Sequence, residues 1–319
     1  MNTLKNNTLH YINDSNFVLC NSNVDKLINY NNSNLSIIYF TNNLKNSNST
    51  KLLLNNSFVD RILVVSDSKN KFKNKKLTFC SKITASTLNS LTHNILILID
   101  INDNYDFLKF VINNLKLLLN LSKKLGINLH HSYNGSSVIC AIISNNSIYF
   151  NDLLNCIKVI LINNSSKQYE FIYDTVCDYL DSQFHNCNLC DFKNDQCVAN
   201  RAKRTAHEFM GCCYSFNYAK LLDFRLLKDV KLCQYMQNRT CATKNITCKL
   251  FTCKYLKEKN IKFDTHKILL LDCFFNKKQH DIIKSNFFRT REEILQKLQE
   301  KNHDLYYWYI LRQKYRIKG

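Results

Sequence analysis

Five short runs of apolar, mostly β-branched residues occur in the first half of the chain, separated by polar or helix-like sequence. Runs that are apolar at nearly every position are typical of strands buried on both faces, and such strands occur in parallel sheets covered by helices. We therefore predict an α/β N-terminal domain with a mostly parallel sheet. The predicted strands are residues 36–40, 61–66, 94–100, 137–143 and 158–162.

One helix is clearly marked in this half, at residues 106–124. Its apolar residues recur every three to four positions, which is the period of a helix with one buried face. Lys123 and Lys124 stand in its last turn and Gly126 follows, a combination that is common at helix C-termini. We expect this helix to be a crossover between two parallel strands.

Two candidate ligand-binding positions, Asp67 and Asp100, stand at the ends of predicted strands. Open α/β sheets commonly bind ligands at the carboxyl ends of their strands. A polar residue that only caps the strand end is the simpler interpretation of both. The only glycines of this half are Gly126 and Gly135, which argues against a standard dinucleotide-binding or P-loop site with its glycine-rich phosphate loop.

The composition changes near Tyr173, where cysteine becomes frequent and the patterning becomes helical. The four earlier cysteines are expected to be buried small apolar residues; they are Cys20, Cys80, Cys140 and Cys156. We predict two domains, residues 1–168 and residues 169–319, the second being a small, mainly helical, cysteine-rich metal-binding domain. Its predicted helices are residues 170–184, 221–236, 249–259 and 290–300, and Thr290 with Glu293 forms a capping box for the last.

Ten of the chain's 15 cysteines lie between Cys187 and Cys273. Intracellular thiols are held reduced, so a disulfide framework is disfavoured in an intracellular chain. Thiolates gathered in one region are what Zn²⁺ or an iron–sulfur cluster requires. A core of reduced thiols, or disulfides in an exported protein, are the alternatives. The predicted metal ligands are Cys187, Cys190, Cys197, Cys212, Cys213, Cys233, Cys241, Cys248 and Cys253.

The choice of metal and the remaining candidates follow from spacing and context. Zinc is the favoured ion, with an iron–sulfur cluster as the alternative, because the spacing does not match the common ferredoxin patterns. His207 lies five residues before Cys212 and is a candidate fourth ligand. Cys273 stands in an apolar run and is expected in the core, whereas His185 and His266 are expected at the surface.

A resemblance supports metal binding by these cysteines. Gly211, Cys212 and Cys213 follow upstream cysteines and resemble the CC core of the bacterial zinc- or iron-chelating cysteine-cluster proteins of the CxxCxxCC type. Residues 232–241 (LCQYMQNRTC) resemble a downstream element of that family, and Cys248 and Cys253 resemble its closing cysteine. The second half is also similar to cysteine-rich proteins of low-GC bacteria. The resemblance covers about residues 187–253 and implies metal chelation without fixing the ion.

Charge and hydropathy bear on partners and location. The net charge is +19, but there is no proline and Lys and Asn are abundant, as in the products of AT-rich genes, so the charge alone does not favour nucleic-acid binding. Residues 304–316 mix aromatic and basic side chains, a pattern that can stack on bases but more often packs a terminal helix. No run approaches the roughly 20 apolar residues of a membrane span, and no signal peptide is evident. We expect a cytoplasmic protein.

The sequence identifies no reaction. The first hypothesis is a metal-binding protein whose cysteine cluster holds zinc or an iron–sulfur cluster. The second is an iron–sulfur enzyme that acts on a substrate held by the α/β domain. The third is a nucleic-acid-binding protein with zinc as scaffold.

Overall fold

The computed structural model describes residues 9–12, 17–21, 35–42, 48–57, 59–67, 74–91, 94–100, 104–125, 132–133, 136–137, 140–143, 148–186, 192–193, 196–197, 236–237, 240–241, 244–252, 254–287 and 289–300. The chain divides into two compact units, residues 1–162 and 163–319. The predicted boundary after residue 168 falls inside helix α6 (Ser165–Asn186). Among the residues just given, no helix is long and apolar enough to span a membrane.

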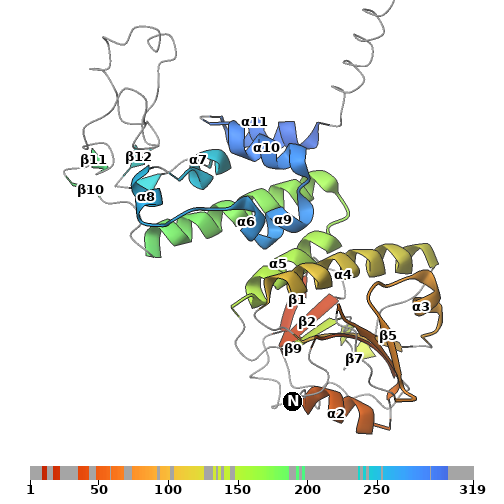
Figure 1. Ribbon diagram of the computed structural model, residues 1–319. Helices are drawn as coiled ribbons and strands as arrows, with labels where there is room; N and C mark the ends of the chain where they lie inside the picture. Colours follow the sequence, from red (N-terminus) through yellow and green to blue (C-terminus); the bar gives the residue numbers. More distant parts are fainter. Residues whose placement is uncertain are drawn as a thin grey trace, which may run out of the picture. The chain divides into compact units, whose positions relative to one another are not determined.

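The first unit is built on a seven-stranded sheet (Figure 1). Its order is β1-β2-β9-β6-β3-β4-β5; β1 is antiparallel to β2, and every other neighbouring pair is parallel. This arrangement agrees with the predicted α/β domain and its mostly parallel sheet. The strands are β1 (Leu9–Ile12), β2 (Phe17–Asn21), β3 (Leu35–Phe40), β4 (Val59–Val65), β5 (Leu77–Cys80), β6 (Asn94–Asp100) and β9 (Cys140–Ile143).

The strand order of this sheet reverses between β3 and β6. From β3 the chain proceeds outward through β4 to β5, then returns to the other side of β3 as β6 and continues to β9. Phe40 is paired with Ile99, so β3 and β6 reach the carboxyl edge of the sheet together. Ligands of open α/β sheets commonly bind where the strand order reverses, so the carboxyl edge of β3 and β6 is a candidate ligand-binding position.

Helices cover both faces of the sheet, which explains the continuous apolar strands. Figure 1 shows α4 and α5 on one side and α2 on the other. Consecutive residues of β3, such as Ile37 and Ile38, point to opposite faces, and both are fully buried. One core cluster joins Ile37 to Leu53 of α2. The helices are α2 (Asn48–Asn55), α3 (Ala85–Asn89), α4 (Tyr105–Leu125) and α5 (Phe150–Leu161), and α4 confirms the predicted helix at 106–124.

Two predicted strands of this unit need correction. The predicted strand at residues 158–162 is wrong, because all but its last residue belong to α5. Its β-branched residues belong to a helix that buries Leu153, Ile157 and Val159, among others. The predicted strand at 137–143 is too long: β9 begins at Cys140, and residue 137 belongs to a small hairpin of β7 (Ser132–Tyr133) and β8 (Ser136–Ser137).

The described part of the second unit is mainly helical and is organised around α6. Helices α7, α9 and α11 contact α6. Residues of α6 such as Ile172, Val176 and Leu180 are buried at helical spacing. The remaining elements are α7 (Ile246–Leu250), α8 (Lys254–Glu258), the 3-10 helix η4 (Thr265–Lys267), α9 (Leu269–Phe274), α10 (Lys277–Ser285) and α11 (Arg291–Gln299).

The helix predictions for this unit have mixed outcomes. The capping box of Thr290 and Glu293 is confirmed at the start of α11. The single helix predicted at 249–259 is wrong, since α7 and α8 are separate and Phe251 has extended backbone. The helix predicted at 221–236 lies outside the described residues except for Met236, which is on a strand.

Two short hairpins lie between α6 and α7 in the chain. One consists of β10 (Phe192–Lys193) and β11 (Gln196–Cys197), and the other of β12 (Met236–Gln237) and β13 (Thr240–Cys241). Both are antiparallel, and in both two residues of sequence separate two-residue strands. The cysteine-rich part of the chain therefore contains two hairpins of identical length.

Candidate functional site

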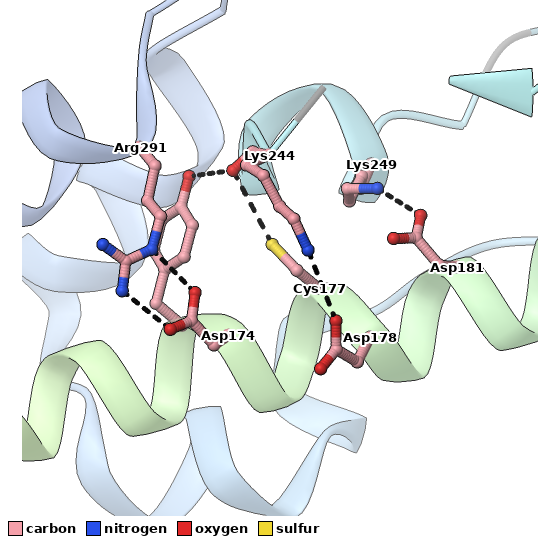
Figure 2. A network of polar contacts seen from close by, with 8 residues as sticks. Asp174, Cys177, Asp178, Asp181, Lys244, Lys249 and Arg291 are labelled. Atoms are coloured by element: carbon pink, nitrogen blue, oxygen red, sulfur yellow. Dashed lines mark hydrogen bonds and ion pairs between the residues drawn. The ribbon is translucent and has the colours of Figure 1, made fainter. Parts of the chain in front are cut away.

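A row of acidic side chains on α6 meets three basic residues from later in the chain (Figure 2). Asp174, Asp178 and Asp181 are spaced by four and three residues, so they share one face of the helix. Their partners are Arg291 of α11, Lys244 just before α7, and Lys249 of α7. The contacts hold the elements that follow residues 187–243, which we call the cysteine-rich segment, against the helix that precedes these residues.

The ion pairs of this network differ in strength. Nε and Nη2 of Arg291 donate to the two carboxylate oxygens of Asp174, each at 2.7 Å, and this bidentate bond raises the pKa of the guanidinium. Lys249 donates to Asp181, with its side chain 3% exposed against 37% for the carboxylate. The contact between Lys244 and Asp178 is 3.7 Å long and largely exposed, so it contributes little to stability.

Tyr173 and Cys177 fix the backbone just before α7. The Tyr173 hydroxyl donates to the carbonyl of Lys244 at 2.7 Å and accepts from the N–H of Ile246 at 3.0 Å. The Cys177 thiol donates to the same carbonyl at 3.8 Å. Burial raises the pKa of this thiol to about 12, so it is protonated at neutral pH and is a poor metal ligand.

Asn245 adds further hydrogen bonds to the backbone at the start of α7. Its side-chain oxygen accepts from the N–H of Cys248 at 2.8 Å and caps α7. Its side-chain amide donates to the carbonyls of Asn286 and Arg289, at 2.9 and 2.8 Å. We call Tyr173, Cys177 and Asn245, with the ion pairs above, the α6–α7 anchor. It fixes the point at which the cysteine-rich segment, residues 187–243, rejoins the helical unit.

The structure places only part of the predicted ligand set. Cys248 lies half-buried on α7, next to the anchor. Cys197 ends β11 and Cys241 ends β13, where their backbones are described. The other predicted ligands lie outside the described residues, as does His207; they are Cys187, Cys190, Cys212, Cys213, Cys233 and Cys253. Within the described part of the chain, no group of three or more His, Cys, Asp or Glu side chains could hold a metal ion.

The earlier cysteines and Cys273 have varied environments. Cys156 is buried in α5, as predicted, whereas Cys80 on β5 and Cys273 on α9 are only half-buried. Cys20 and Cys140 lie on the neighbouring strands β2 and β9. Burial raises the pKa of the Cys80 thiol, with partial opposition from a backbone hydrogen bond. Among the described side chains, Cys80, Cys156 and Cys273 belong to no group that could hold a metal ion.

A different polar group lies where the sheet order reverses. Asp100 is the last residue of β6, and its Oδ2 accepts from the hydroxyls of Tyr39, at 3.1 Å, and Thr41, at 3.4 Å. Tyr39 is on β3 and Thr41 directly follows the strand, two residues on, so both side chains lie on the face of the sheet that Asp100 shares. Burial raises the pKa of the Asp100 carboxyl, and the two hydroxyl bonds oppose the rise. Asp67, the other predicted candidate, is exposed beyond β4.

Two histidines of the second unit form another titratable pair. The imidazoles of His266 and His280 stack with centroids 4.4 Å apart, and Nδ1 of His266 lies 3.5 Å from Oδ1 of Asp272. His280 is buried. Desolvation and the nearby His266 lower the pKa of His280. The surface position predicted for His266 agrees with its side-chain exposure of 59%.

Comparisons with protein-family models, with curated proteins and with solved structures found no match to this chain. The resemblance of residues 187–253 to cysteine-cluster proteins therefore stays a prediction. Inference about function depends on the residues themselves, above all the cysteines around the two hairpins.

Proposed function

We propose that this protein binds a metal through thiolates of the cysteine-rich segment and of Cys248, with zinc as the favoured ion and an iron–sulfur cluster as the alternative. The observation that carries the proposal is the matched placement of cysteine at the two hairpins. Cys197 pairs with Phe192, and Cys241 pairs with Met236, at the same register position. Each hairpin thus ends on a cysteine.

A second cysteine precedes each hairpin in sequence. Cys190 comes two residues before β10, and Cys233 comes three residues before β12. A tight turn lets two nearby thiolates approach one ion, which is why paired cysteines around turns are typical of structural zinc sites. Four thiolates complete a tetrahedral zinc site or an iron–sulfur cluster. Two such pairs supply that number, and the other predicted ligands allow a second site.

The α6–α7 anchor supports the proposal energetically. Bringing the ends of a long loop together costs chain entropy, and this cost grows slowly with loop length. Hydrogen bonds and ion pairs between α6 and α7 hold the ends of residues 187–243 in place. Part of the entropy cost of gathering the cysteines is therefore offset by contacts that do not involve a metal.

The test is elemental analysis with an absorption spectrum on the full chain purified without oxygen. A colourless protein with stoichiometric zinc supports the favoured form, and a brown protein with iron and acid-labile sulfide supports the alternative. We expect Cys197→Ser and Cys241→Ser to lose most of the metal. Cys80→Ser, on β5 in the first unit, is the matched control and should keep it. Wild-type protein without bound metal would refute the proposal.

A further inference from the structure

The two stacked histidines of the second unit differ in their surroundings. His280 of α10 is 4% exposed, and its Nδ1 has no hydrogen-bond partner among the described residues. The imidazole of His266, from η4, lies against it with ring centroids 4.4 Å apart and an interplanar angle of 25°. The side chain of His266 is 59% exposed, so the pair joins a surface element to a buried ring.

The buried ring fits this site better in its neutral form. A neutral imidazole has one nitrogen without hydrogen, so an Nδ1 in that state leaves no donor unsatisfied. Protonation places an N–H on both ring nitrogens, and the donor at Nδ1 would then be buried without an acceptor from the described part of the chain. It would also place a positive charge where burial limits its hydration. Proton uptake by His280 therefore opposes the packed arrangement of the pair.

The charged neighbours of His280 act mostly in the same direction. Burial, and then the nearby His266 and Lys284, lower the pKa of His280, while Asp272 of α9 and a hydrogen bond with the backbone of Leu271 oppose this shift in part. Helices α7 and α11 also contact α10, and each charged side chain of these two helices has a polar partner of its own. These pairs are Lys249 with Asp181, Arg291 with Asp174, Glu292 with Arg291, Glu293 with Arg289, and Lys297 with Asn286.

The short helix η4 is the element that can give way. Its cap, Asp264, accepts at its side-chain oxygen from the N–H of His266 at 3.0 Å and at its carbonyl from the N–H of Lys267 at 2.9 Å. These bonds are local and do not tie η4 to α10. We propose that His266 and His280 form a pH-sensitive latch, which holds η4 against α10 while His280 is neutral and releases η4 when His280 takes up a proton. This inference does not depend on the proposed metal site.

Release of η4 would reach the helix that precedes the cysteine-rich segment. Phe263 comes just before the Asp264 cap, and its ring lies against that of Phe184, near the end of α6, with centroids 5.4 Å apart. The N–H of Phe263 donates to Oγ1 of Thr252 at 3.3 Å. Because Phe263 is joined to η4 through one residue, we expect these contacts to loosen together with the latch.

Hydrogen exchange of the full chain between pH 7.5 and 5.5 tests the latch. At each pH the wild type is compared with His280→Phe, which keeps a ring beside His266 but takes up no proton, so the intrinsic pH dependence of exchange cancels. One proton taken up on release changes the opening equilibrium by at most about tenfold per pH unit below about pH 6.5. We expect the wild type to approach this loss of protection in residues 262–268 relative to the variant, with protection retained in α6 and α10.

Two further variants keep the test sharp. His280→Gln has a polar side chain that does not titrate, so it should match His280→Phe and replaces it if Phe is not tolerated. His93→Gln removes a histidine of the first unit and should keep the wild-type pH dependence. Equal pH dependence of residues 262–268 in the wild type and a folded His280 variant would overturn the inference. Loss of protection throughout α6 and α10 over the same pH range would also overturn it, because the whole unit would then unfold rather than release η4.

Discussion

Replacing Tyr173 by Phe tests how the helical unit holds the end of the cysteine-rich segment. The Tyr173 side chain is 0% exposed, and its hydroxyl is bonded on both sides to the backbone before and at the start of α7. Phe fills nearly the same volume, so the change removes two hydrogen bonds and little packing. The N–H of Ile246 is in the first turn of α7, where it has no partner within the helix.

The two lost bonds have unequal costs. A buried donor without an acceptor costs about 1–3 kcal/mol, and this applies to the Ile246 N–H, since Ile246 is fully buried. The Lys244 carbonyl keeps the weak Cys177 donor at 3.8 Å, so its loss is smaller, about 0.5–1 kcal/mol. We expect Tyr173→Phe to lower the free energy of unfolding of the second unit by about 1.5–4 kcal/mol.

Urea unfolding of the full chain, followed by circular dichroism, measures this change. The midpoint should fall while the dependence on urea concentration stays the same, because the folded state keeps its surface. Tyr179→Phe removes a hydroxyl from the same helix at a position that is 44% exposed, and it should change the unfolding free energy by less than about 0.5 kcal/mol. Equal effects of the two substitutions would refute the idea that the hydroxyl anchors α7.

Three further perturbations follow from the charges of the two units. Asp181→Asn leaves the buried Lys249 ammonium without its carboxylate and should destabilise the protein by about 1–3 kcal/mol, after allowance for the partial exposure of Asp181. Lys249→Met removes the buried charge itself and should cost about 0–1 kcal/mol. Thermal unfolding should therefore show a lower melting temperature for Asp181→Asn than for Lys249→Met. Burial raises the folded pKa of Asp100, so wild-type stability should fall as pH rises from about 3.8 through the raised pKa. The stability of Asp100→Asn relative to wild type should therefore increase over this pH range. A difference in stability that stays constant with pH would contradict this prediction. The folded pKa of His280 is lowered, so the unfolded state takes up a proton first as the pH drops, and wild-type stability should fall below about pH 6.5. Melting temperatures measured from pH 8 to 5 should fall less for His280→Gln than for the wild type. Parallel curves for the two proteins would contradict this prediction.

The sheet was predictable where the local pattern and the tertiary environment agree. Residues 37–40 and 95–99 are apolar throughout, and both lie in central strands covered on two faces. Residues 158–162 have the same β-branched composition, yet they continue a helix whose buried face starts at Leu153. A five-residue run cannot distinguish these cases, because a short apolar run fits a buried strand or one turn of a buried helix.

The candidate sites were predictable only in part, for a physical reason. Asp100 could be placed at a strand end, but its contact with Tyr39 depends on the pairing of β3 with β6, which requires the fold. The bidentate pair of Asp174 with Arg291 joins residues 117 positions apart, and no local pattern indicates it. The similarity of the two hairpins could have been noticed in sequence, since an asparagine precedes Cys197 and Cys241 by three residues in each case.

The packing of the second unit changes what removal of a metal should do. If the metal supplied most of the folding free energy, as in small zinc domains, its loss would unfold residues 163–319 as a whole. The helices, however, have a hydrophobic core of their own, which includes Val176, Leu180, Ile246, Leu271, Ile283 and Ile294. The α6–α7 anchor adds buried hydrogen bonds that involve no cysteine of the predicted ligand set except the backbone of Cys248.

We therefore expect chelation to act on part of the unit only. Hydrogen exchange of the full chain, before and after chelator treatment, should show lost protection within residues 187–243 and retained protection in α6, α9, α10 and α11. Zinc added back should restore the first pattern, which controls for irreversible damage. Loss of protection throughout these helices would mean that the metal stabilises the whole unit and that its apolar core is insufficient alone. Retained protection would mean that the helical unit is a stable frame and that metal binding orders only the chain held between its ends.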